Sequence, residues 1–275
     1  MSDNTKISYV DATWSPVIGC TKCSPGCENC YAEKMAFRLM AMERSRLENE
    51  LGGKYSQVIG RIGGWTGNII CDKSALDKPL HWRKPRRILV PSMGDLFHEK
   101  VPFGFISDTY EVTAKCPQHD FYFLTKRPEK AAEFYRKYVW KPRTPNIHLG
   151  VTISTQKEAD EKIPILLQIP AAHRWISIEP MLEEIDLFRS MPCGYYCSED
   201  VGHVDHNTLR GINGIVVGCE SGPKRRPCDP DWIRSIVQQC KAASVKCFVK
   251  QIEINGKVSH NPAEWPEELR VRDLP

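Results

Sequence analysis

The sequence predicts an α/β fold, namely a full or partial (βα) barrel with about six parallel strands. Short apolar segments alternate with helix-forming segments along most of the chain. The apolar segments are mostly continuous, which is typical of parallel strands covered on both faces. Each ends in glycine or polar residues, as strands do at the active face of such barrels. The alternative, an open doubly wound sheet, lacks a GxGxxG turn after the first strand.

The individual elements follow from apolar runs and their breaks. Strands are predicted at 7–10, 87–93, 121–125, 147–154, 175–178, 212–218 and 246–250. Helices are predicted at 31–50, 104–115, 129–138, 156–168 and 231–243. We expect one barrel domain over 1–251, with insertions near 51–70 and 191–210, and a C-terminal extension over 252–275.

Composition restricts the function classes. The 275 residues carry a formal charge of +4, which permits binding to a polyanion without requiring it. No run approaches the ~18 consecutive apolar residues of a membrane span, and the N-terminus does not resemble a secretory signal. We therefore expect a cytoplasmic protein with no membrane partner. In that reducing compartment, its 12 cysteines are not expected to form disulfides.

Four cysteines cluster near the N-terminus, at Cys20, Cys23, Cys27 and Cys30. Three of them can hold a [4Fe-4S] cluster and leave one iron open, as C-x3-C-x2-C from Cys23 or C-x6-C-x2-C from Cys20. S-adenosylmethionine (SAM) can chelate the open iron, and an electron can then split it to a 5′-deoxyadenosyl radical. The alternative is a four-cysteine zinc site, whose two pairs usually lie ~15–20 residues apart, whereas three residues separate them here.

Longer motifs make the sequence recognisable. In order, they are TWSPVIGC, SPGCENCYAE, SMGDLF, FLTKRPE, LGVTIS, WISIEPML, IVVGCESGP and PDWIRSIVQQC…VKCFVKQ, from 14 to 251. The chain resembles the phage and prophage three-Cys-motif family, whose members are radical-SAM-like. The resemblance implies a barrel of the radical SAM type and cluster ligands Cys20, Cys27 and Cys30. The usual radical SAM spacing instead favours Cys23, so the third ligand stays open.

The resemblance also implies roles for residues at strand ends. Gly94 and Asp95 lie where radical SAM enzymes receive the SAM amino group, and a carboxylate at a strand end suits an ammonium. Ser177 and Glu179 resemble residues that contact the ribose or the carboxylate. Gly218 and Glu220 lie where a late strand approaches adenine. For each of them, a strand-end cap or turn is the structural alternative.

Two further groups of residues could bind ligands. Cys193, Cys197, His203 and His206 could bind zinc, although a surface loop is the favoured interpretation. Basic residues that could grip phosphates, with Trp82 as a stacking surface, adjoin predicted active-face loops. They are Arg83, Lys84, Arg86, Arg87, Lys126, Arg127, Lys224, Arg225 and Arg226. The alternative is an ordinary solvated surface.

The functional prediction is a radical SAM enzyme acting on a nucleic-acid base. Viral thymidine hypermodification includes radical SAM isomerases, so the resemblance implies conversion of nitrogen-linked to carbon-linked glycyl-thymidine in bacteriophage DNA. The partners would be modified DNA and an external electron donor, in the host cytoplasm, and the outcome would be evasion of host restriction. The alternatives are a radical SAM enzyme with a protein or small-molecule substrate, and a non-catalytic zinc-stabilised DNA-binding protein.

Overall fold

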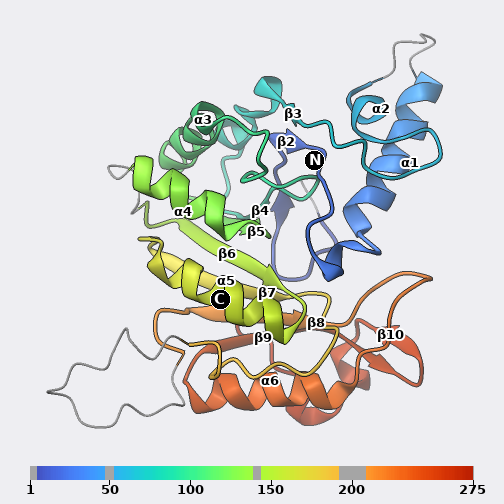
Figure 1. The fold of residues 1–275 in the computed structure, drawn as a ribbon, viewed down its shortest axis with the longest axis vertical. Coiled ribbons are helices and arrows are strands. Elements are labelled where there is room, and N and C mark those ends of the chain that lie inside the picture. Colours follow the sequence, from blue (N-terminus) through green and yellow to red (C-terminus); the bar gives the residue numbers. More distant parts are fainter. Residues whose placement is uncertain (1–4, 47–52, 139–143, 192–208, 275) are drawn as a thin grey trace, which may run out of the picture.

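The fold is mixed α/β, built on a curled, mostly parallel half-barrel sheet (Figure 1). The structure is a computed structural model and describes residues 5–46, 53–138, 144–191 and 209–274. Within these ranges the sheet has eight strands, in the order β1-β4-β5-β6-β7-β8-β9-β10. Their bounds are β1 Ala12–Thr13, β4 Arg87–Val90, β5 Asp120–Thr125, β6 Ile147–Ile153, β7 His173–Ile178, β8 Gly214–Gly218, β9 Lys246–Ile254 and β10 Lys257–Ser259.

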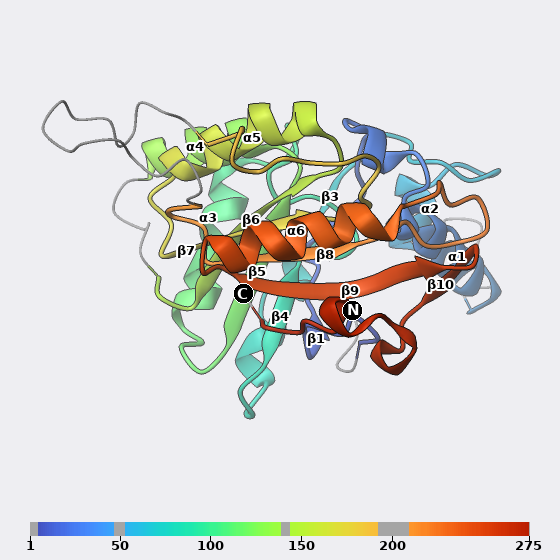
Figure 2. The ribbon, with the colours of Figure 1, turned by 90° about the horizontal axis from the view of Figure 1, so that it is seen from below.

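Neighbouring strands from β1 to β9 pair in parallel, and β10 pairs antiparallel to β9. The crossovers between parallel strands contain the helices α3 Phe103–Ala114, α4 Pro128–Lys137, α5 Gln156–Gln168 and α6 Pro230–Ala242. Two further helices, α1 Tyr31–Arg46 and α2 Lys54–Val58, lie on the side to which β9 runs (Figure 2). The strands β2 Val17–Ile18 and β3 Ile70–Cys71 flank these two helices in sequence and pair antiparallel as a small second sheet.

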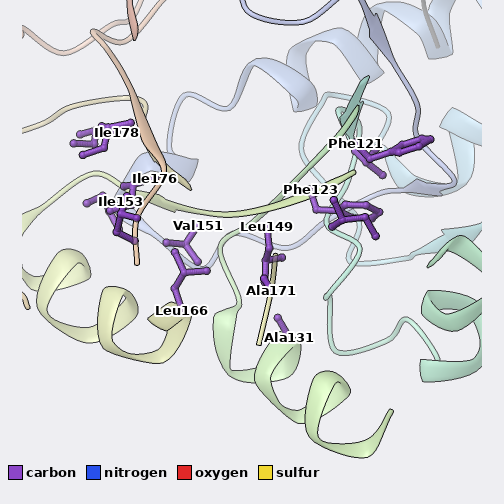
Figure 3. Packing of buried hydrophobic residues seen from close by; sticks show 14 of the residues in the cluster. Phe121, Phe123, Ala131, Leu149, Val151, Ile153, Leu166, Ala171, Ile176 and Ile178 are labelled. Carbon is purple, nitrogen blue, oxygen red and sulfur yellow. The ribbon is translucent and has the colours of Figure 1, made fainter. Parts of the chain in front are cut away.

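The main core lies between the outer face of the sheet and the helices that cover it. Alternate residues of each strand, such as Phe121 and Phe123 on β5, turn toward the helices because successive side chains point to opposite faces. Figure 3 shows this packing, with Ala131 of α4 and Leu166 of α5 facing the strands. The helices therefore hold the strands in place, and the candidate site lies at the carboxyl ends of these strands.

The concave face is apolar at the amino ends of the strands. Leu89, Tyr122, Trp175, Val216 and Phe248 form a second cluster there, together with Tyr9 and Val10. Tyr9 contacts Trp175 and Phe248 edge-on, at ring-centroid distances of 6.0 and 5.9 Å. The prediction of a strand at 7–10 was therefore wrong. This segment contains a turn that packs against the concave face of the half-barrel, and the first strand starts at Ala12.

The other predicted strands and the helices are confirmed, with ends shifted by a few residues. The predicted helix over 31–50 is described only as far as Arg46. The described residues contain seven parallel strands, where about six were expected. The predicted extension from 252 begins inside β9, and the chain returns to this strand where Val249 N donates to Val271 O at 2.9 Å. No helix in the described part of the chain is long and apolar enough to cross a bilayer.

Candidate functional site

The cysteine segment lies across the carboxyl ends of the parallel strands. Gly19 pairs with Gly94 just beyond β4, and Gly19 N donates to Met93 O at 3.0 Å. A Cβ on Gly94 would lie 2.9 Å from the carbonyl oxygens of Val17 and Gly19. Only glycine allows this backbone approach. Glycine at position 94 therefore allows the cysteine segment to pack against the chain just beyond β4.

The same segment reaches the end of β6 through Gly26. A Cβ on Gly26 would lie 2.3 Å from Ser154 Oγ and 3.2 Å from Pro180 Cδ. Gly26 belongs to the 3-10 turn Pro25–Cys27, which Ser24 caps by accepting a hydrogen bond from Gly26 N. The loop is therefore seated directly on the strand ends.

The four thiols have different surroundings. Cys23 donates a hydrogen bond to Cys27, which lowers the pKa of Cys27 to about 5 and raises that of Cys23. Burial raises the pKa of Cys20 to about 11, although the Arg127 cation opposes the shift. Cys23 is exposed, Cys27 is buried, and Cys20 and Cys30 are half-buried.

The donor chemistry of this loop fits an iron–sulfur cluster, but the ligand set is not assembled. In the ranges that the structure describes, no three His, Cys, Asp or Glu side chains are placed to hold one metal ion. Cys23 donates a hydrogen bond to Cys27, whereas the Cys20 sulfur accepts one from Arg127 Nη1. Thiolates are the ligands of such clusters, and Cys20, Cys23, Cys27 and Cys30 share one short loop. Cysteine side chains in the loop would have to rotate to bring three thiolates around one cluster.

Arg127, which follows β5, is buried and anchors the start of the loop. Its Nη2 donates to Thr21 O at 2.9 Å and Thr21 Oγ1 at 2.8 Å, and its Nη1 donates to Cys20 Sγ at 3.7 Å. Asp95 Oδ2 accepts from Nη1 at 3.2 Å, and Glu99 Oε1 accepts from Nε at 2.8 Å. Arg127 was expected to contact nucleic acid; in this structure its guanidinium bonds to protein acceptors, and the nucleic-acid role stays a prediction.

Asp95 has a different role from the one expected. Its Oδ1 accepts from Phe97 N and Thr125 Oγ1, and its Oδ2 accepts from Lys126 N and Arg127 Nη1, at 2.8–3.2 Å. A carboxylate offers about four acceptor positions. With these four filled, Asp95 joins the ends of β4 and β5. The expected contact between Asp95 and the SAM amino group stays a prediction.

A second ion pair holds the other end of the loop. Glu220 Oε1 accepts from Arg226 Nη2 at 2.5 Å, and Glu220 Oε2 accepts from Asn29 Nδ2 at 3.0 Å. Arg226 Nη1 donates to Pro25 O and Glu28 Oε2. Burial alone would raise the pKa of Glu220, but the bonds from Arg226 outweigh it and the pKa is lowered. Glu220 and Arg226, expected at adenine and at phosphate, are thus occupied in fixing the loop.

Under the loop, the concave face turns polar. Ser154 Oγ is fully buried and has no hydrogen-bond partner, and Glu179 Oε1 forms an ion pair with Lys250 Nζ at 2.8 Å. Ser177 is buried on β7, the strand that precedes Glu179. Gly218 leaves room beside Glu179, since a Cβ there would lie 3.2 Å from Glu179 Oε1. Ser177, Glu179 and Gly218 thus lie on neighbouring strand ends, and their contacts with SAM stay predictions, whereas Ser154 was noticed only as a polar strand end.

The basic segment before β4 lies at the amino ends of the strands, whereas the cysteine loop lies at their carboxyl ends. Residues 82–86 precede β4 and Arg87 is its first residue, so the segment lies opposite the strand ends that carry the cysteines. Trp82 is 7% exposed, and Lys78 and Arg86 lie over its ring, so it offers no open stacking surface. Arg87 pairs with Asp11. The expected placement of Trp82, Arg83, Lys84, Arg86 and Arg87 at the active face is therefore corrected.

The remaining basic residues lie near the loop. Lys126 lowers the pKa of Cys27 through its charge, although Cys23 contributes most. The Lys224 side chain is exposed, and its carbonyl accepts from Asn29 Nδ2 at 2.8 Å. Arg225 is half-buried and donates to Gly256 O. Of the residues expected to contact phosphate, Lys126 and Lys224 thus lie near the cysteine loop. The possible zinc ligands Cys193, Cys197, His203 and His206 lie outside the described residues.

Comparison with known proteins gives one match. A family model described as "Protein of unknown function (DUF5131)" covers residues 4–264. No curated protein and no solved structure matches the chain. Because the family model spans nearly the whole chain, including the cysteine loop and every strand of the half-barrel, the chain belongs to the DUF5131 family.

Proposed function

We propose that this protein is a radical SAM enzyme with a [4Fe-4S] cluster bound by three of the four loop cysteines. The observation that carries the proposal is the seating of four cysteines on the carboxyl ends of a parallel half-barrel, above the unpartnered hydroxyl of Ser154. Active sites of (βα) barrels form at this end. A buried hydroxyl without a partner is costly, so a polar ligand at this position would satisfy it.

The cluster and SAM would together supply a carbon-centred radical able to remove a hydrogen atom from a substrate. Cys27 and Cys30 would be ligands, with Cys20 or Cys23 as the third. Ser154, Ser177 and Glu179 would orient the polar parts of SAM, and Lys250 would hold the Glu179 carboxylate in place. Tyr9, Trp175 and Phe248 would close the amino end of the half-barrel to water.

For the substrate, we propose a nucleic-acid base, and most specifically glycyl-modified thymidine in viral DNA. Two things support this: the resemblance to phage proteins, and the position of Lys126 and Lys224 near the loop, where they could contact phosphate. The reaction would convert nitrogen-linked to carbon-linked glycyl-thymidine and help the genome evade host restriction. An external donor would supply the electron, and the enzyme would act in the host cytoplasm.

The test is anaerobic reconstitution with iron and sulfide, followed by incubation with SAM, a reductant and phage DNA. We expect 5′-deoxyadenosine and an altered thymidine in the digested DNA. SAM cleavage with unchanged nucleosides would favour a protein or small-molecule substrate, and no SAM cleavage by a zinc-loaded protein would favour the zinc-stabilised DNA-binding alternative. Cys27→Ser should abolish cleavage, whereas Cys71→Ser, at a half-buried cysteine outside the loop, should retain it.

A further inference from the structure

Arg127 distinguishes Cys20 from the other three cysteines. Its guanidinium donates to the Cys20 sulfur and to both oxygens of Thr21. Cys23 instead donates a hydrogen bond to Cys27, and Arg226 donates to the Pro25 carbonyl. The loop is therefore fixed by two arginines, and only Arg127 contacts a thiol among the described contacts.

The grip of Arg127 is rigid because the guanidinium is itself held in place. Asp95 accepts from Nη1 and Glu99 accepts from Nε, and the side chain is 6% exposed. Asp95 is fixed in turn by the backbone amides of Phe97 and Lys126. The position of the Cys20 sulfur is thus tied to the ends of β4 and β5 through one planar cation.

The charge of Arg127 suits a thiolate more than a thiol. Metal ligation requires deprotonated cysteine, and a half-buried thiolate needs a compensating cation. Arg127 places a cation beside Cys20, since its Nη1 lies 3.7 Å from the sulfur. Hydrogen bonds to ligand sulfurs raise the reduction potential of iron–sulfur clusters.

We infer that Arg127 is a positioning residue for Cys20, which fixes this thiol at the strand ends and donates to its sulfur when the sulfur binds metal. The metal-bound half of this inference rests on the proposed function. The positioning half does not, since it concerns the loop of the metal-free protein. Among the described residues, Arg127 contacts the loop at Cys20 and Thr21.

The variant that tests the inference is Arg127→Lys. It keeps the charge, but an ammonium lacks the planar fork that reaches Thr21, Asp95 and Cys20 together. Arg136→Lys is the matched control, because Arg136 is exposed on α4, the helix that Arg127 directly precedes. Glu99→Gln is a milder second variant, since the Glu99 side chain is 67% exposed and its loss should not prevent folding.

Hydrogen exchange on the metal-free full chain tests positioning. With Arg127→Lys we expect amides of 20–23 to exchange faster, by roughly tenfold, as expected when a local opening loses one charge-assisted hydrogen bond. Amides of 25–30 should change less than those of 20–23, Glu99→Gln should give a smaller acceleration, and Arg136→Lys should give none. Equal exchange of 20–23 in wild type and Arg127→Lys, with both folded, would overturn the positioning role.

The reduction potential of the anaerobically loaded protein tests the contact with sulfur. Arg127→Lys should shift it to a more negative value, and the same change in a Cys20→Ala background should add no further shift. An equal shift in both backgrounds, or none in either, would overturn the action through Cys20. If wild type takes up no iron, the proposed function fails and with it the metal-bound half of the inference, while hydrogen exchange still decides the positioning half.

Discussion

Gly26 lies so close to Ser154 that a Cβ on the glycine would come within 2.3 Å of the serine hydroxyl oxygen. The first residue belongs to the cysteine loop and the second follows β6, so this approach joins the loop to the sheet. It also closes the loop over a hydroxyl that has no hydrogen-bond partner. A substitution at Gly26 therefore tests the seating of the loop, and one at Ser154 tests ligand binding.

Gly26→Ala should unseat the loop. The added methyl group must displace Ser154 or Pro180, and overpacking of this kind costs about 1–3 kcal/mol. We expect a lower free energy of unfolding and lower iron uptake on reconstitution, measured by denaturant titration and metal analysis. Gly104→Ala is the control, because nothing lies within 4 Å of its Cβ position, and it should be neutral or stabilising. Equal behaviour of the two variants would argue against the seating of the loop on β6.

Ser154→Ala should change binding more than stability. Removing a buried hydroxyl without a partner leaves the free energy of unfolding unchanged or raises it by up to about 1 kcal/mol. If this hydroxyl contacts SAM, the affinity of the reconstituted protein for SAM should fall roughly tenfold, the effect of losing about 1.4 kcal/mol. Isothermal titration calorimetry and denaturant titration measure the two quantities. A stability loss of several kcal/mol with unchanged SAM affinity would rule out this role.

Glu220→Gln should weaken the loop in a pH-dependent way. The folded-state pKa of Glu220 is lowered, so the carboxylate contributes stability at neutral pH that is lost as the pH falls through that value, below about 4.5. We expect the variant to be less stable than wild type by about 1–3 kcal/mol at pH 7, because Arg226 loses its charged partner. The difference should shrink toward pH 4 in denaturant titrations. A constant difference between pH 7 and pH 4 would show that the carboxylate charge is not what matters.

Lys126 and Lys224 should contribute to nucleic-acid binding, whereas Arg83 and Lys84 should contribute less. The first two lie near the cysteine loop and the second two are exposed at the opposite end of the sheet. Each phosphate contact that a substitution removes lowers the slope of log affinity against log salt by about 1. We expect Lys126→Gln with Lys224→Gln to reduce this slope, and Arg83→Gln with Lys84→Gln to leave it nearly unchanged. The reverse ranking in fluorescence anisotropy titrations would refute the assignment.

The fold was predictable because parallel strands covered on both faces are mostly apolar and do not alternate with polar residues, as in 147–153 and 214–218. The segment 7–10 is equally apolar but packs as a plug, since Tyr9 finds Trp175 and Phe248 on the concave face. Whether 7–10 forms a strand or packs on the concave face depends on contacts with strands more than 150 residues away in sequence. The local sequence pattern therefore could not predict it. The antiparallel β10 was missed because its three residues, Lys257–Ser259, show no strand pattern of their own.

The candidate site was predictable in place more than in detail. Four cysteines at close spacing fall at the strand ends, as the (βα) pattern implies. Asp95 looked available because three of its four donors come from residues 125–127, about 30 positions further along the chain. Trp82 looked like a stacking surface because its sequence neighbours are basic, yet it is buried against the core. Both features depend on burial and pairing that only the tertiary structure sets.

An iron–sulfur cluster in the cysteine loop is the feature on which the proposed chemistry depends. It can be tested by measuring the metal and sulfide content of the full chain purified without oxygen, in comparison with Cys27→Ala. We expect a brown protein with about four irons and matching sulfide per chain, both lost in the variant. A colourless protein with one zinc per chain, retained after exposure to iron and sulfide, would refute the cluster.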